Sequence, residues 1–80
     1  MMKASEGSIM SYQSSLERLI GQSGIVIDTV PSERHGVGVV KVGGQLWSAD
    51  TDWATPLEPG TTIWVVGRTS LVLAVIPERI

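Results

Sequence analysis

The chain has 80 residues, a formal net charge of −2 and 42% hydrophobic residues. This size fits one small globular domain and excludes a second. The chain has no cysteine, which excludes disulfides, thiolate metal sites and thiol nucleophiles. The slightly acidic balance argues against a protein that mainly binds phosphate backbones, because such proteins carry a basic excess. No uncharged stretch reaches the roughly 20 apolar residues of a membrane-spanning helix, and the N-terminus lacks the apolar segment of a secretory signal.

The first twenty residues divide into an unpatterned part and a short predicted helix. Residues 1–10 are mostly small and polar, so we interpret them as a disordered arm, a linker or an expression remnant. From Ser11 a helix is predicted, because apolar residues recur on one helical face and Gly21 offers a stop. The apolar residues are Tyr12, Leu16, Leu19 and Ile20. A helix this short is not stable alone, so we expect it to dock on the domain or to lead in from an upstream segment.

After Gly24, short β-branched runs alternate with turn residues, at a spacing typical of a small sandwich or barrel. Five strands are predicted, at residues Ile25–Val30, Val37–Val42, Gln45–Asp50, Thr62–Gly67 and Ser70–Ile76.

The turn residues between these runs predict how the strands connect. The dipeptide Gly43-Gly44 predicts a tight hairpin with a type I′ turn, because both glycines tolerate positive φ. A second hairpin is predicted through Gly67-Arg68-Thr69, and Pro77 closes the last strand. The interval Thr51–Gly60 is broken by prolines, so it is predicted to be a loop that crosses one end of the barrel.

Alternation along the strands assigns an inward and an outward face. The predicted inward residues are Val40, Val42, Trp47, Ala49, Ile63, Val65, Leu71, Leu73 and Val75. The outward set is partly polar, but it also includes Leu46, Trp64, Val72 and Ala74. A small aliphatic interior without any Phe fits an all-β, small five-stranded OB-like barrel, where the interior volume limits side-chain size.

The same segments resemble the C-terminal domain of NfeD-like proteins. The resemblance covers about Leu19 to Pro77, and its most specific element is the hairpin followed by Trp47-x-Ala49. The rest of the pattern is a glycine-led first strand, a Gly-x-x-Val-x-Val strand and a closing Leu-x-Val strand. The resemblance implies a five-stranded OB-like barrel. Two residues depart from it: Trp64, where a smaller side chain is expected, and Trp53 in the crossing loop.

The resemblance also implies a function. NfeD-like proteins are usually membrane proteins whose barrel follows transmembrane helices, and they are associated with stomatin- and flotillin-like membrane scaffold proteins. The expected function is a non-catalytic protein-interaction module that acts with such a scaffold protein, as a soluble domain at the cytoplasmic face. The expected division is an arm, short helix or linker at residues 1–18 and the barrel at residues 19–80. No cofactor, metal or small-molecule substrate is expected.

An OB-like barrel leaves an alternative function open, as a module that binds single-stranded nucleic acid. Such modules combine a basic groove with stacking aromatic side chains. In this chain Arg34, Lys41 and Arg68 are scattered among acidic residues. Because electrostatic attraction carries most non-specific binding, this alternative is disfavoured.

Residue patterns that would indicate an enzyme or an ion site are incomplete. His35 is the only histidine and lies in a polar turn without a partner for nucleophilic catalysis. Asp50-x-Asp52 lacks the further ligands and the glycine of a calcium loop. Gly36-x-Gly38 opens a strand where a dinucleotide site requires a helix. We therefore expect no catalytic activity.

The tryptophans remain as candidate binding residues. Trp47 is predicted to lie in the core, and Trp53 is predicted either to close one end of the barrel or to bind a partner. Trp64 is predicted to point outward, where it enlarges an apolar patch unless another element covers it. The candidate protein-binding residues are Trp64, Trp53 and Arg68. We expect the N-terminal helix or a protein partner to pack on Trp64.

Overall fold

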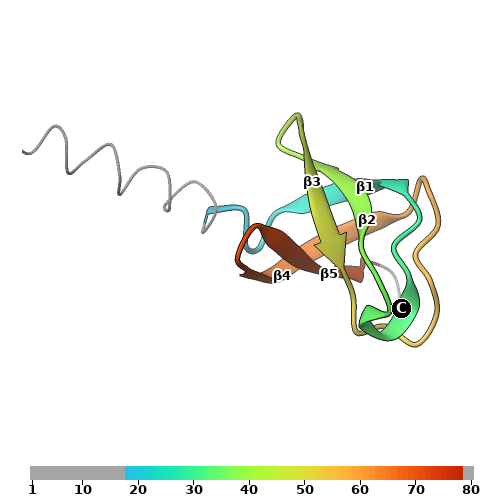
Figure 1. Ribbon diagram of the computed structural model, residues 1–80. Helices are drawn as coiled ribbons and strands as arrows, with labels where there is room; N and C mark the ends of the chain where they lie inside the picture. The colour runs from blue at the N-terminus through green and yellow to red at the C-terminus, as the bar shows by residue number, and fades with distance from the viewer. Residues whose placement is uncertain (1–17, 79–80) are drawn as a thin grey trace, which may run out of the picture.

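A computed structural model describes residues 18–78, which form a closed barrel of five strands (Figure 1). The strands are β1 (Ser23–Asp28), β2 (Gly38–Val42), β3 (Gln45–Asp50), β4 (Thr62–Thr69) and β5 (Val72–Pro77), and the 3₁₀ turn η1 (Ser32–Arg34) follows β1. The predicted all-β barrel is confirmed. Of the predicted N-terminal helix, only Arg18 and a turn through Leu19–Gly21 are described; its earlier part lies outside the described residues.

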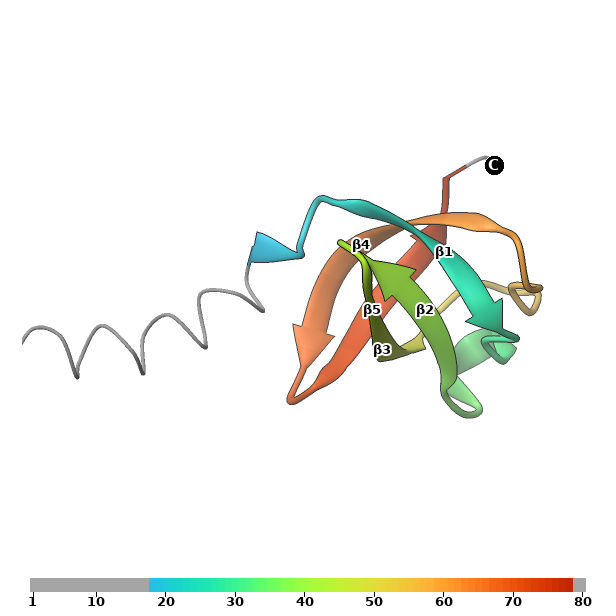
Figure 2. The same cartoon turned by 90° about the horizontal axis from the view of Figure 1, so that it is seen from above.

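The order of strands around the barrel is β1-β2-β3-β5-β4. Strand β1 pairs antiparallel with both β2 and β4, and this double pairing closes the barrel (Figure 2). Strands β3 and β5 are parallel, and their pairing covers only Ala49↔Leu73 and Asp50↔Ala74. The strand count and closure agree with the OB-like barrel that the sequence predicts.

One predicted hairpin is confirmed and the position of the other is wrong. Gly43 and Gly44 connect β2 to β3 with φ angles of 61° and 83°, as a type I′ turn requires. The second turn does not lie at Gly67-Arg68-Thr69, because β4 continues to Thr69 and the chain turns at Ser70 and Leu71. Ser70 adopts a φ of 58°, so a serine takes a left-handed conformation in this turn.

The strand ends differ from the prediction where distant segments meet. Strand β1 begins at Ser23 and ends at Asp28, and Val30 instead forms an isolated bridge to Leu57 in the crossing loop. Two backbone hydrogen bonds of 2.9 Å join Val30 and Leu57. Strand β2 begins one residue later than predicted, and β5 begins and ends later than predicted. The loop at residues 51–60 is therefore joined by hydrogen bonds to the segment that follows β1.

The core is aliphatic. Its buried residues are Leu19, Val26, Val30, Val40, Val42, Ala49, Leu57, Ile63, Val65, Leu73 and Val75. Trp47 is half-buried and packs against the cluster. The predicted inward orientation is confirmed for Val40, Val42, Ala49, Ile63, Val65, Leu73 and Val75. Leu71 was predicted to point inward but is 53% exposed, because it belongs to the turn.

Candidate functional site

The outer surface of β4 carries an exposed tryptophan between two neighbouring strands. Trp64 is 38% exposed and lies opposite Ser23 of β1 and Ile76 of β5. Val66, two residues along β4, is 52% exposed. Together these strands form what we call the Trp64 face, made of Ile25, Thr62, Trp64, Val66, Ala74 and Ile76. None of its members is charged, whereas an ordinary protein surface is rich in charged side chains.

A bulge in β4 separates Arg68 from this face. The register between β4 and β5 shifts between Val65 and Gly67, so Val66 is an extra residue. After the shift Arg68 lies opposite the buried Leu73, and directly opposite residues of an antiparallel pair share one face. Arg68 is half-buried, and its Nη1 donates a hydrogen bond of 3.1 Å to the carbonyl oxygen of Ser70. The bulge thus aims Arg68 at the end of the barrel rather than at the Trp64 face.

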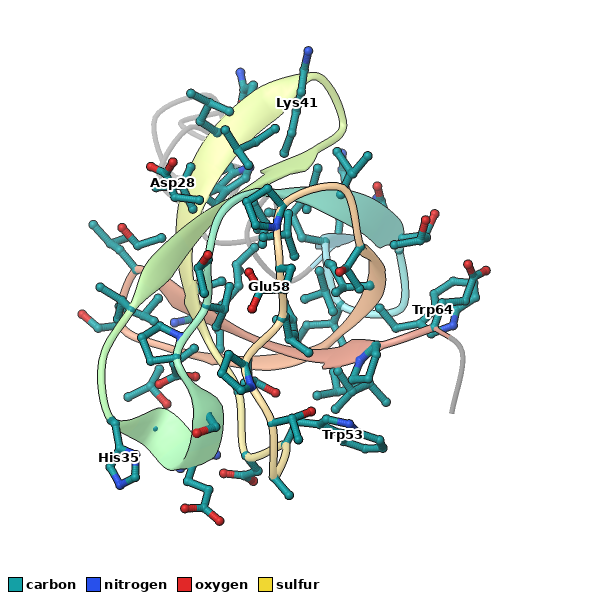
Figure 3. The ribbon with its side chains drawn as sticks, turned by 90° about the vertical axis from the view of Figure 1, so that its right-hand side faces the viewer. Asp28, His35, Lys41, Trp53, Glu58 and Trp64 are labelled. Carbon is teal, nitrogen blue, oxygen red and sulfur yellow. The ribbon has the colours of Figure 1, made fainter. Side chains whose placement is uncertain are left out.

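Trp53 lies in the loop after β3. Its side chain is half-buried and packs against the core. Its backbone N–H donates to Thr51 Oγ1 at 3.1 Å, and its carbonyl accepts from the N–H of Glu33 at 2.9 Å. In Figure 3, Trp64 projects outward from β4, while Trp53 extends from the loop. The structure therefore does not bring the three candidate residues together in one site.

Sequence reasoning missed three members of the Trp64 face. Val66 could have been found, because it follows Trp64 at the two-residue period of a strand. Ile25 and Ile76 join the face only through the pairing of β1 and β5 with β4, and no local pattern shows that register. The sequence thus identifies the central residue, whereas the fold identifies its neighbours.

Charged side chains elsewhere in the described part of the chain form no assembled site. Arg34 Nε lies 2.7 Å from Asp52 Oδ1, but both side chains are more than half exposed. His35 lies exposed in the turn after η1 (Figure 3). Among residues 18–78, no group of three or more His, Cys, Asp or Glu side chains is placed to hold a metal ion.

The surface that OB-folds commonly use for nucleic acids lacks stacking residues here. That surface is the outer face of the second and third strands. On β2 and β3 the exposed outward side chains include Lys41, Leu46 and Ser48, with a single cation and no aromatic ring. The exposed tryptophan lies on β4 instead.

The fold and the Trp64 face define a small barrel domain with an uncharged, partly exposed apolar surface. The family model of the NfeD-like C-terminal, partner-binding domain matches residues 16–77, and the chain belongs to this family. No curated protein matches it significantly. Within residues 18–78 no helix has the length and apolarity needed to cross a membrane.

Three solved structures are similar to this chain. The C-terminal domain of stomatin operon partner protein 1510-C from Pyrococcus horikoshii is 33% identical with a TM-score of 0.68, covering 80% of this chain and 94% of that chain. The soluble domain of the NfeD protein YuaF from Bacillus subtilis is 30% identical with a TM-score of 0.72, covering 100% and 95%. The soluble domain of a Corynebacterium glutamicum membrane protein implicated in regulation of membrane protease activity shares the fold at 22% identity, with a TM-score of 0.69, covering 78% and 95%.

Proposed function

We propose that this chain is a non-catalytic module that binds a stomatin-like membrane scaffold protein through the Trp64 face, at the cytoplasmic side of a membrane. The family is a partner-binding domain, and one similar structure is named as part of a stomatin operon partner protein. Two others are named as soluble domains of an NfeD protein and of a membrane protein. The family description and the stomatin operon name support the class of partner, and the surface of the barrel supports the mode of contact.

The observation that carries the proposal is the absence of charged residues from the Trp64 face. Protein interfaces are depleted of charged residues at their centre and enriched in tryptophan, and a few such residues carry most of the binding energy. Here Trp64 lies between Val66, 52% exposed, and Ile25, 40% exposed. Removing these apolar side chains from water would favour association, since burial contributes about 25 cal/mol per Å².

The proposed module begins at Leu19, with residues 1–18 as a lead-in arm and residues 19–80 as the barrel. Leu19 is 8% exposed and belongs to the core, whereas its neighbour Ile20 is 41% exposed. Gly21 and Gln22 continue the pairing along β4, with Gly21 N–H donating to the carbonyl of Val65 at 2.7 Å. The burial and the hydrogen bonds support a unit that starts at Leu19.

The proposal is tested by measuring the affinity of the 80-residue chain for a purified stomatin-like protein. We expect binding well above that of an unrelated five-stranded barrel. Trp64→Ala should weaken it by about 30-fold, which corresponds to the loss of about 2 kcal/mol typical of a central interface residue. The matched control is Val37→Ala, because Val37 is 57% exposed and lies before β2, away from the Trp64 face.

Circular dichroism establishes that both variants remain folded. No enrichment over the unrelated barrel would refute the proposed partner. Equal affinities of the wild type and Trp64→Ala for that partner would refute the assignment of the Trp64 face. If Trp64→Ala also leaves the stability unchanged, neither a partner nor the N-terminal segment packs on Trp64.

A further inference from the structure

The first four residues of β3 pair with β2 on one side only. Among residues 18–78, no strand pairs with them on the other side. Strand β3 pairs with β2 from Val42↔Gln45 to Gly38↔Ala49. Its pairing with β5, on the other side, begins only at Ala49. In Figure 1 the hairpin of β2 and β3 accordingly extends beyond the start of β5. Residues 45–48 are therefore open on the side where β5 would otherwise continue.

The backbone of this edge directs hydrogen-bonding groups outward from the sheet. In a two-residue hairpin the pair next to the turn, here Val42 and Gln45, exchanges its hydrogen bonds, and such pairs alternate along the ladder. Gln45 and Trp47 therefore direct their backbone groups toward β2. Leu46 directs its N–H and C=O to the open side, and Ser48 directs its N–H there. These groups are the ones that an additional strand would engage.

The edge also lacks the features that usually prevent strand addition. Natural edge strands are protected by charged side chains, prolines, bulges or a covering segment. The stretch Gln45–Ser48 contains neither charge nor proline, and its register with β2 has no shift. Leu46 is 62% exposed, the largest exposed fraction among the large hydrophobic side chains described. Such an edge promotes aggregation unless another strand pairs with it.

We propose that an extended segment of the protein partner adds to this edge as a further strand beside β3. The inference rests on the proposed function, and it specifies how the partner is held. Main-chain hydrogen bonds to Leu46 and Ser48 would supply affinity, and side chains at alternate positions would supply specificity. The segment that fits is an extended one, with an apolar side chain next to Leu46 on the outer face. Lys41 lies opposite Leu46 on β2, which favours an acidic residue nearby in the segment.

The test compares two substitutions of one residue. Leu46→Pro removes the N–H on the open side and leaves the hydrogen bonds to β2 in place, and proline is tolerated in edge strands. Leu46→Ala removes the same side chain but keeps the N–H. Both variants of the 80-residue chain are titrated with the purified stomatin-like protein, and amide hydrogen exchange of the wild-type chain is measured by NMR with and without that protein.

We expect Leu46→Pro to bind at least about tenfold more weakly than Leu46→Ala, because a main-chain hydrogen bond is lost and the ring blocks the approaching strand. The Leu46 and Ser48 amides should exchange at least about tenfold more slowly in the complex than in the free chain. If Leu46→Pro does not fold, the exchange measurement on the wild type decides alone.

The remaining outcomes separate the two proposals. If the wild type does not bind the stomatin-like protein, the proposed function fails and strand addition fails with it. If the wild type binds while the Leu46 and Ser48 amides still exchange rapidly, only strand addition is overturned. If these amides are already protected in the free chain, and sedimentation gives the mass of a dimer, the edge pairs with a second copy of the chain. That result overturns the addition of a strand from the partner.

Discussion

Gly24 lies where β1 meets the end of β2, and we predict that a methyl group there weakens the barrel. A Cβ at this position would lie 2.5 Å from the carbonyl oxygen of Lys41 and 2.6 Å from Cγ2 of Val42. The neighbouring residue Ile25 is paired with Lys41, so the carbonyl cannot move without opening β1 from β2. Inserting a methyl group into a filled space costs about 1–3 kcal/mol, and we expect about 2 kcal/mol for Gly24→Ala.

The matched control is Gly67→Ala. A Cβ on Gly67 meets nothing within 4 Å, and Gly67 is not among the glycines with positive φ. Such a substitution stabilises a protein by about 0.4–1 kcal/mol, because it restricts the unfolded chain.

Thermal unfolding followed by circular dichroism measures both variants. For a domain of this size about 1 kcal/mol shifts Tm by roughly 4–8 °C, so Gly24→Ala should melt roughly 8–16 °C below the wild type. Gly67→Ala should melt a few degrees above the wild type. A Gly24→Ala variant that melts at or above the wild-type temperature would show that β1 and β2 are not in close contact there.

Three further substitutions test the start of the barrel and its exposed ion pair. Leu19→Ala should lower the free energy of unfolding by about 2–4 kcal/mol, because Leu19 is a core residue. Ile20→Ala should change it by less than about 1 kcal/mol, and equal effects in urea unfolding would refute a start at Leu19. Arg34→Ala should cost less than about 1 kcal/mol, since Arg34 and Asp52 are 57% and 72% exposed. A larger loss, or one that persists in 1 M salt, would contradict a solvent-screened pair.

Local sequence patterns predict those parts of the fold whose cause is local. The hairpin at Gly43-Gly44 follows from two adjacent residues that accept positive φ, and β3 was predicted with its observed bounds. The alternation of Ile63, Trp64 and Val65 predicts their observed orientations, because each residue of a regular strand reverses the face.

The errors arise where a contact between distant segments decides the conformation. Gly67 was predicted to begin a turn, but it pairs with Ala74 after the bulge and the strand continues. The first strand was predicted to begin after Gly24, but Gly24 lies inside β1, where the backbone of Lys41 approaches it closely. The placement of Arg68 beside a buried residue follows from the same bulge, which no local pattern shows.

The candidate surfaces differ in how far the sequence reveals them. Trp64 could be identified from strand alternation and from its unexpected size. The open edge at Leu46 could not, because it depends on where the parallel pairing of β3 with β5 begins. Leu46 was assigned to the outer face, but an outward side chain says nothing about whether the backbone beside it has a partner.

Strand β5 links the two surfaces, because it carries Ala74 and Ile76 of the Trp64 face and lies next to β3 in the strand order β3-β5-β4. This arrangement allows one partner to contact both, with an extended segment along β3 and a packed surface on Trp64. We then expect Trp64→Ala and Leu46→Pro to weaken binding of the same partner. The losses in binding free energy that the two substitutions cause should add within about 0.5 kcal/mol in the double variant. Isothermal titration of the stomatin-like protein with the single and double variants measures this sum. A double variant that binds as tightly as either single variant would show that the two surfaces do not act together on that partner.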